Sequence, residues 1–384
     1  MDFSNVQAYL ERLIEAGQTM AQLVVTQGYE TVYSRNFGWA DAAKTVPMTD
    51  RHLCWCFSNS KVYTAVCLMR LAEDGKVSLD DPVSKYLPEF AECRYRRGDE
   101  IVKSETPITL RHLISMTSGL TYNKENEYPH FTEACKRPGV TTREAVAALA
   151  QGLVLSFEPG TDFRYGLGHD VIGAVIEVAS GMRFSDYMRR TIFEPLGIRD
   201  TDFRPDAEQQ ARFAVMCRYN DATHTFDPYE PKNEFAFSEN YDSGGAGLFS
   251  RPKEYVKLLT ALACGGTAEN GYRVLKPETI RRMSENQLCE KALRTYRIAD
   301  GNREIVHKRG CGYAMGVRTH MDPAVSGRKT SAGEFGWDGA AGAFSLVDRE
   351  KKLAFCYVEH NRNYRAHHMT HFELLNLVCE ALER

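Results

Sequence analysis

A serine and a lysine three positions apart, Ser58 and Lys61, are the residues of this chain best suited to covalent chemistry. Residues three apart are neighbours on a helix, so a helix that begins at or just before Ser58 places the hydroxyl and the amine on one face. A serine hydroxyl is a weak nucleophile until a base removes its proton, and a neutral, desolvated lysine amine can be that base. The pair therefore predicts nucleophilic catalysis, and the competing interpretation is that Ser58 only caps a helix.

The same spacing alone is weak evidence of a site, because it occurs three times: at Ser58/Lys61, Ser250/Lys253 and Ser326/Lys329. The second copy contains Pro252, which is typical of a helix start, and the third lies in a polar stretch typical of a loop. Only the first is followed by apolar residues at helical spacing, from Val62 to Ala72, with Gly75 just past the end.

Two other segments contain groups that could complete such a site. Tyr165 lies on a loop flanked by glycines before a helix that Asp170 starts and Gly181 ends, and its phenol could relay a proton to a leaving group. The stretch from Gly333 to Gly342 is rich in glycine, which lets a backbone N–H approach a ligand and act as an oxyanion donor. A packing tyrosine and an ordinary glycine-rich turn are the alternatives.

The elements that must position these groups predict an α+β fold. Helical periodicity predicts helices at both ends of the chain, over 3–17 and 367–382. Alternation predicts strands within 22–38, 311–319, 343–347 and 353–359. Between them, the pattern of 110–235 predicts mainly helices and loops. We therefore expect an antiparallel sheet built from both ends of the chain, with terminal helices and an inserted, mainly helical region. The expected lobes are 1–75 with 240–384, and 76–239, and the active site is expected in the cleft between them.

Composition excludes several classes of function. The chain has 384 residues, 43% of them hydrophobic, and a net charge of −3, which argues against nucleic acid or an anionic membrane as partner. Its first residues do not form a signal peptide, and its longest apolar stretch, 145–155, is too short to span a bilayer.

The 11 cysteines include no Cys-x-x-Cys pair and predict reduced thiols and a cytoplasmic location. His367, His368 and His371 are the nearest approach to a metal site, but we expect no metal and no cofactor.

Taken in order, these segments resemble the class C-like branch of the serine β-lactamase superfamily. That branch includes D-alanyl-D-alanine carboxypeptidases, class C β-lactamases, family VIII carboxylesterases and related acyltransferases. The resemblance spans nearly the whole chain and is carried by Ser58-Asn59-Ser60-Lys61 and residues 71–87, 108–113, 117–120, 195–201 and 243–248. It implies a β-lactamase/transpeptidase-like fold, catalysis by Ser58, Lys61 and Tyr165, and an oxyanion hole formed by the backbone N–H groups of Ser58 and Ala340.

Two departures from the family pattern bear on the substrate. The common Tyr-x-Asn motif is here Tyr165-Gly166-Leu167, which lacks the amide that would bind a lactam. The Lys-Thr-Gly or His-x-Gly motif is here Trp337-Asp338-Gly339, which lacks the cation expected to bind a substrate carboxylate. Tryptophan at this point is similar to the esterase and acyltransferase members, and both changes count against efficient β-lactam turnover. The substrate-binding candidates are Leu167, Trp337, Asp338 and Gly339.

The sequence therefore predicts a serine hydrolase that forms an acyl-enzyme with small esters of uncharged acyl groups. The alternatives are a D-amino-acid peptidase or amidase, in which Asp338 pairs with a substrate ammonium, a weak β-lactamase, an acyltransferase, and a non-catalytic binding protein. The expected partner is a small-molecule ester or amide, and the oligomeric state stays open. Aromatic residues at 120–140 and 220–242 belong either to the pocket wall or to the core; they are Tyr122, Tyr128, Phe131, Tyr229, Phe235, Phe237 and Tyr241.

Overall fold

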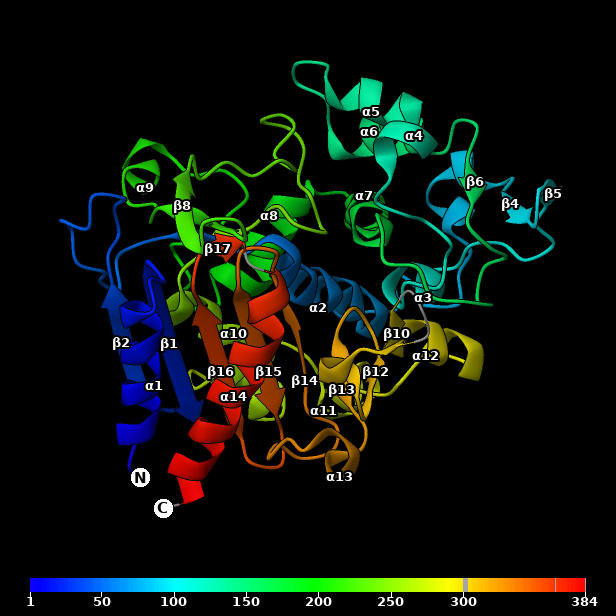
Figure 1. Ribbon diagram of the computed structural model, residues 1–384. Helices are drawn as coiled ribbons and strands as arrows, with labels where there is room; N and C mark the ends of the chain where they lie inside the picture. Colours follow the sequence, from blue (N-terminus) through cyan, green and yellow to red (C-terminus); the bar gives the residue numbers. More distant parts are fainter. Residues whose placement is uncertain (300–302, 363, 384) are drawn as a thin grey trace.

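A seven-stranded antiparallel sheet dominates the computed structural model, which describes residues 1–299, 303–362 and 364–383 (Figure 1). In spatial order its strands are β12 (Cys311–Tyr313), β13 (Arg318–His320), β14 (Phe335–Asp338), β15 (Ala343–Asp348), β16 (Leu353–Val358), β1 (Met20–Gln27) and β2 (Glu30–Gly38). The α+β class and the antiparallel sheet expected from the sequence are confirmed.

Strands from the two ends of the chain pair with each other in this sheet. β1 pairs with β16 from Gln22 opposite Val358 to Gln27 opposite Leu353. The strands expected at 22–38, 343–347 and 353–359 are confirmed, whereas the stretch 311–319 forms parts of two strands. The chain turns between β12 and β13 near Gly316, which has a positive φ of 78° that favours glycine.

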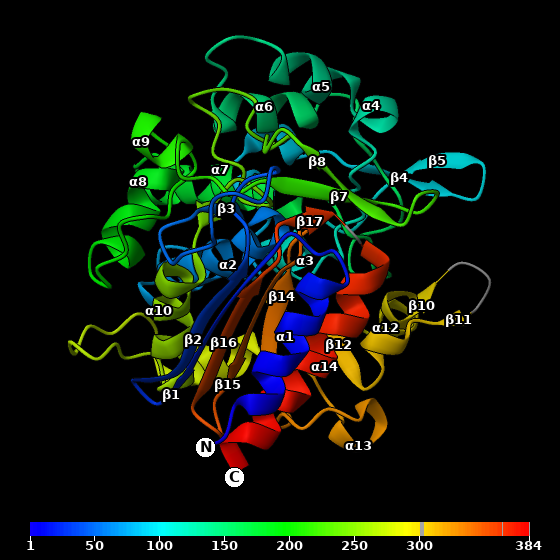
Figure 2. The same cartoon turned by 60° about the vertical axis from the view of Figure 1, so that its left-hand side comes forward.

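The terminal helices cover one face of the sheet. α1 (Ser4–Glu15) and α14 (Tyr364–Glu383) lie side by side in Figure 2, and their apolar residues form one buried cluster with the strands. Leu10 from α1 and Leu374 from α14 contribute to this cluster with Phe344 and Phe355 of the sheet. An apolar stripe on each helix therefore explains why both ends of the chain fold onto the same face.

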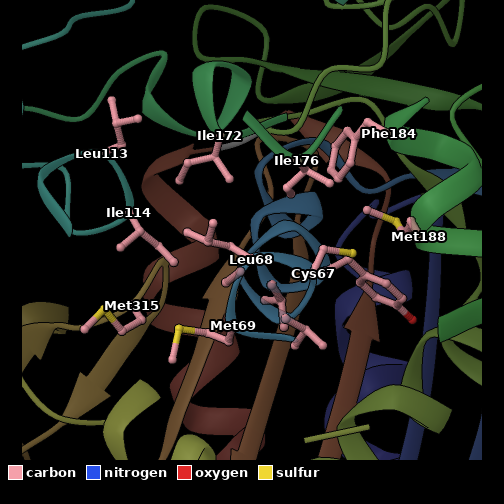
Figure 3. Close-up of a cluster of buried hydrophobic side chains, with 14 of the residues drawn as sticks. Cys67, Leu68, Met69, Leu113, Ile114, Ile172, Ile176, Phe184, Met188 and Met315 are labelled. Carbon is pink, nitrogen blue, oxygen red and sulfur yellow. The ribbon is translucent and has the colours of Figure 1, made fainter. Parts of the chain in front are cut away.

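The opposite face of the sheet packs on α10 (Pro252–Ala263) and on α2 (Ser60–Glu73), the helix that carries Lys61. Figure 3 shows Cys67 and Leu68 of α2 facing Ile172 and Ile176 of α7 (Gly168–Ser180) across a close-packed apolar cluster. α2 is therefore buried almost all round, and a charged residue at its start must lie in a low-dielectric environment.

The region between the two halves of the sheet contains short helices and small sheets. Its helices are α3 (Leu110–Ile114), α4 (Lys124–Glu127), α5 (Pro129–Cys135), α6 (Thr142–Leu149), α8 (Phe184–Met188) and α9 (Ala207–Gln210), and α11 (Pro277–Met283), α12 (Glu290–Arg297) and α13 (Pro323–Ser326) follow α10. Its strands are β3 (Cys54–Trp55), β4 (Arg94–Arg97), β5 (Glu100–Lys103), β6 (Val154–Leu155), β7 (Met216–Asn220), β8 (Thr225–Tyr229), β9 (Phe249–Ser250), β10 (Ile298–Ala299) and β11 (Arg303–Glu304).

Two hairpins in this region, β4–β5 and β7–β8, were not predicted. Their residues are mostly exposed, so the alternation of apolar and polar residues that reveals a half-buried strand is missing. α6 opens with a capping box, in which the Thr141 side chain accepts from the Glu144 N–H and the Glu144 side chain accepts from the Thr141 N–H. The division of the chain into two lobes stays a prediction.

The described part of the chain contains no helix that is both long and apolar enough to cross a membrane. Within the same residues, no group of three or more His, Cys, Asp or Glu side chains could hold a metal ion, and the side chain of His368 lies outside the described part. All eleven cysteines carry free thiols, as the sequence predicts.

Candidate active site

Ser58 lies on a tight 3₁₀ turn, η1 (Phe57–Asn59), rather than on the first turn of the α-helix that follows it. Phe57 has a positive φ of 45°, a conformation that costs free energy in a bulky residue and persists only when the surrounding structure enforces it. Tyr255 helps to hold the turn, because its hydroxyl donates to the Asn59 carbonyl oxygen over 2.7 Å. Phe57 and Asn59 are buried while Ser58 keeps some exposure, so the turn presents the hydroxyl alone.

Lys61 lies directly behind this hydroxyl. Its Nζ is 3.2 Å from Ser58 Oγ, 2.6 Å from the Gly245 carbonyl oxygen and 3.1 Å from the Tyr122 hydroxyl. The side chain is completely buried. The amine is therefore held by three neighbours at hydrogen-bond distance, and one of them is the candidate nucleophile.

Burial lowers the pKa of Lys61 to about 7, and the nearby Asp170 opposes this shift by raising it. Asp170 is itself buried, and its Oδ1 accepts hydrogen bonds from Ser243 Oγ over 2.7 Å and from the Tyr241 hydroxyl over 3.0 Å. With a pKa near 7, about half of the Lys61 amines are neutral at neutral pH, which is the state that a general base needs.

The close fit around Lys61 requires glycine at position 245. A Cβ on Gly245 would lie 2.6 Å from Asp170 Oδ2 and 2.9 Å from the Tyr122 hydroxyl, closer than real Cβ contacts. Gly245 therefore lets its own carbonyl reach Lys61 while Asp170 and Tyr122 stay close to the amine. This accounts for the second glycine of the Ser-Gly-Gly-Ala-Gly-Leu segment at 243–248.

Two tyrosines reach Lys61, although the sequence assigned a chemical role to only one. Lys61 Nζ lies 4.7 Å from the centre of the Tyr165 ring, and the Tyr165 hydroxyl accepts a hydrogen bond from Trp337 Nε1 over 3.0 Å. Tyr122, which touches the amine directly, was named only as a wall or core aromatic. Its one signal in the sequence is its place two residues after the segment 117–120 that carries the family resemblance.

Strand β14 brings the candidate oxyanion hole to the nucleophile turn. A Cβ on Gly339 would lie 2.2 Å from the carbonyl oxygen of Cys56, so only glycine allows this approach. The N–H groups of Ser58 and Ala340 make no hydrogen bond to any other described residue outside regular helices and strands. Both residues line the cavity described below, and the assignment of their N–H groups as the oxyanion hole stays a prediction.

A cavity of about 290 Å³ opens beside Ser58. Its walls are Ser58, Phe163, Tyr165, Tyr296, His307, Lys308, Arg318, Trp337, Asp338, Gly339, Ala340 and His367. It thus collects all the predicted site residues except Lys61, which lies behind Ser58, and Leu167. The Leu167 side chain is buried in the core cluster around α2 and does not belong to the wall.

The other two Ser-x-x-Lys pairs do not form such a site. Lys253 Nζ pairs with Asp50 over 2.9 Å, and Lys329 Nζ pairs with Glu380 over 2.5 Å, so each lysine is engaged with a carboxylate. Ser326 Oγ contacts His320 Nε2 instead of a lysine. The spacing is the same in all three copies, and the tertiary structure supports the distinction that the flanking sequence predicts.

Exchanging each tyrosine for phenylalanine separates their roles. We expect Tyr165→Phe to lower kcat for a 4-nitrophenyl ester by about 10²-fold, because it removes the cavity-lining hydroxyl that is predicted to relay a proton. Burial raises the pKa of Tyr122 well above its usual value, so this phenol does not ionise and serves to orient the amine.

Tyr122→Phe is therefore the matched control, with an expected loss of roughly tenfold or less. Steady-state kinetics on both variants, with thermal unfolding to verify their folding, provides the measurement. A Tyr122→Phe loss larger than that of Tyr165→Phe would move the relay to Tyr122.

Comparison with known proteins places the chain among relatives of similar length. The Beta-lactamase family model matches residues 6–378. Esterase EstB of Burkholderia gladioli is 30% identical over 358 residues, which cover 87% of this chain and 84% of the esterase. Acyltransferase calJ of Penicillium decumbens is 30% identical over 313 residues, which cover 77% and 73% of the two chains. The solved structure of EstCE1, a hydrolase with promiscuous acyltransferase activity, superposes with a TM-score of 0.81 at 23% identity over 97% of each chain, a likeness that shows the fold.

Proposed function

The chain belongs to the beta-lactamase family, and from this premise we propose that it is a carboxylesterase-like serine hydrolase that cleaves small esters through an acyl-enzyme on Ser58. One observation carries the proposal: Ser58 Oγ lies 3.2 Å from a buried lysine amine at the wall of a cavity. A half-exposed hydroxyl beside a base of lowered pKa is the arrangement that nucleophilic catalysis requires.

In the acylation step, Ser58 Oγ attacks the ester carbonyl carbon while neutral Lys61 takes the hydroxyl proton. The carbonyl oxygen becomes an oxyanion that accepts hydrogen bonds from the N–H groups of Ser58 and Ala340. The tetrahedral intermediate then collapses, the bond to the alcohol oxygen breaks, and Tyr165 gives that oxygen a proton while it receives from Lys61 the proton taken from Ser58. The alcohol leaves and the acyl group stays on Ser58.

Deacylation reverses these roles with water as the nucleophile. The Lys61–Tyr165 pair removes a proton from water as its oxygen attacks the acyl carbon, and the proton passes to Ser58 Oγ as the ester bond breaks. The carboxylic acid leaves and the free enzyme is restored. Each step uses only side chains and backbone groups of this chain.

The contact between Trp337 and Tyr165 favours esters over β-lactams and D-amino-acid amides. Trp337 occupies the position of the motif cation and donates to the Tyr165 hydroxyl over 3.0 Å. Asp338, the candidate partner for a substrate ammonium, already lies 3.5 Å from the buried guanidinium of Arg318. Position 337 therefore offers no cation to the carboxylate of a β-lactam. Asp338, which the peptidase alternative pairs with a substrate ammonium, already has Arg318 as its partner.

A panel of 4-nitrophenyl esters with acyl chains of two to eight carbons, run beside a chromogenic cephalosporin, tests the proposed function. We expect turnover of short-chain esters and little turnover of the cephalosporin. Comparable or faster cephalosporin hydrolysis would favour the β-lactamase alternative. No hydrolysis of any ester, together with no labelling by a fluorophosphonate probe, would favour the non-catalytic alternative.

The pH profile provides a prediction from the lowered pKa of Lys61. Since the neutral amine is the reactive form, kcat/KM should rise through an apparent pKa near 7 and level off above it. Asp170 raises the pKa of Lys61, so Asp170→Asn should move the rising limb to lower pH. A profile without a limb between pH 6 and 8, or a limb that Asp170→Asn moves to higher pH, would contradict this role of Lys61.

Acyl transfer to an alcohol is the second candidate, and the relatives support it. Acyltransferase calJ matches over most of this chain, and water and an alcohol compete for the same acyl-enzyme. Product analysis with 4-nitrophenyl butyrate and a series of added alcohols measures this competition. Hydrolysis should dominate if the chain is an esterase, whereas dominant ester exchange at millimolar alcohol would make it a transferase.

The cytoplasmic location and the two-lobed division also remain proposals. Eleven free thiols, nine of them buried, suit a reducing compartment. Ser58 and Lys61 from one proposed lobe meet Tyr122 and Tyr165 from the other, which supports a site between the two.

A further inference from the structure

The cavity beside Ser58 contains a lysine that the proposed mechanism does not use. Lys308 is the last residue of the short turn η5 (Val306–Lys308) and forms part of the cavity wall. Its Nζ donates to the Tyr296 carbonyl oxygen over 2.9 Å and lies 4.5 Å from the centre of the Tyr296 ring, which lines the same cavity. The ammonium is therefore a half-buried cation at the edge of the substrate space.

The other strong charges near this wall balance each other. Arg318 Nη2 lies 3.2 Å from Glu334, Arg328 Nη1 lies 3.4 Å from the same carboxylate, and Arg318 Nη1 lies 3.5 Å from Asp338. These two carboxylates match the two guanidinium groups. Among the side chains that the structure describes, no carboxylate lies within ion-pair distance of Lys308, so its positive charge has no direct counter-charge there.

His367, another basic residue of the cavity wall, has a carboxylate partner within the protein. His367 Nε2 lies 2.7 Å from Glu359, and both side chains are buried. Burial lowers the pKa of Lys308 to about 8, and Asp338 raises it, so the ammonium stays mostly charged at neutral pH. A cation removed from water without a counter-ion is costly, and an anion brought by a ligand would relieve that cost.

We propose that Lys308 binds a carboxylate of the substrate, so that the esters this site cleaves best are those that carry a negative charge. The inference rests on the proposed esterase function and specifies its substrate class. It replaces the expectation of uncharged acyl groups, which followed from the missing cation at position 337. The sequence could not show that a segment thirty residues earlier supplies a cation to the same cavity.

Two matched pairs of esters test the inference on the full chain. Mono-4-nitrophenyl adipate and 4-nitrophenyl hexanoate differ in an acyl-side carboxylate, and 4-acetoxybenzoate and phenyl acetate differ in one on the alcohol side. We expect kcat/KM to favour the anionic member of at least one pair by about tenfold or more, the scale of one charged hydrogen bond in a partly buried site. The pair that shows the preference identifies the side of the ester that faces Lys308.

The variants Lys308→Met and Lys308→Arg, with Lys291→Met as control, attribute this preference to one side chain. Lys308→Met should lower the anionic-to-neutral ratio of kcat/KM about tenfold or more, and Lys308→Arg should retain most of it. Lys291 lies on the nearby helix α12, is exposed and pairs with Asp162, so Lys291→Met should leave the ratio unchanged. Equal ratios in wild type and Lys308→Met would overturn the inference.

Inhibition of the wild-type enzyme provides a test that no variant can obscure by misfolding. Hexanoate should compete with 4-nitrophenyl acetate, and hexylammonium should compete at least tenfold more weakly. Equal or stronger inhibition by hexylammonium would overturn the inference. Turnover of neutral esters without any anionic preference would refute the carboxylate site alone, whereas failure of every ester to acylate Ser58 would refute the proposed function itself.

Discussion

Replacing Ser58 by alanine is expected to lower kcat for a 4-nitrophenyl ester on the order of 10⁴-fold or more. The variant lacks the oxygen that forms the acyl-enzyme, and no other described Ser-x-x-Lys pair reaches this cavity. The fold should persist, because the Ser58 side chain is partly exposed. The buried Lys61 amine loses one hydrogen-bond partner but keeps the Tyr122 hydroxyl and the Gly245 carbonyl oxygen.

Ser326→Ala is the matched control for this loss. Ser326 has the same spacing to a lysine, but its hydroxyl contacts His320 and its lysine pairs with Glu380. Its kcat should stay within about twofold of wild type. Esterase activity that survived in purified Ser58→Ala at more than a few per cent of wild type would exclude Ser58 as the nucleophile.

Replacing Lys61 by arginine is expected to lower kcat by two or more orders of magnitude, about the scale of a lost general base. A guanidinium keeps its proton at any ordinary pH, so arginine at this position is positively charged but cannot accept the Ser58 proton. Lys61→Ala should be as damaging while leaving the fold nearly intact, because it removes a fully buried amine whose desolvation is costly.

Lys329→Arg, in the third Ser-x-x-Lys copy, controls for a general effect of the exchange, since this exposed lysine pairs with Glu380. Steady-state rates with thermal unfolding curves distinguish lost chemistry from lost folding. Near-normal activity in folded Lys61→Arg would contradict general-base catalysis by Lys61 and would leave the family and the fold unaffected.

The sequence was most informative where chemistry or periodicity depends on near neighbours. The Ser58/Lys61 spacing, the strands β1, β15 and β16, and the helix α7 with its Gly181 C-cap all follow from patterns within a few residues. Helical structure begins just before Ser58, as predicted, but as the 3₁₀ turn η1 that Phe57 enters at positive φ, and the α-helix α2 starts only at Ser60.

The groups that the sequence missed contact the site from distant segments. Tyr122, Asp170 and Lys308 approach Lys61 or the cavity only after the chain has folded, and no local spacing marks them. The hairpins β4–β5 and β7–β8 escaped for a related reason, since exposed strands carry little apolar alternation. The charge of the cavity thus depends on residues brought together by long-range packing, and it cannot be predicted from the motif at 337–339 alone.

Intact-protein mass spectrometry after rapid acid quench, with 4-nitrophenyl acetate as substrate, tests the proposed acyl-enzyme most directly. During turnover, a fraction of the wild-type protein should be heavier by the mass of one acetyl group, and peptide mapping should place that group on Ser58. The adduct should be absent from Ser58→Ala and should disappear from wild type when the substrate is exhausted. Full hydrolytic turnover with an acetyl group on any other residue, or with an adduct of equal yield in Ser58→Ala, would contradict catalysis through Ser58.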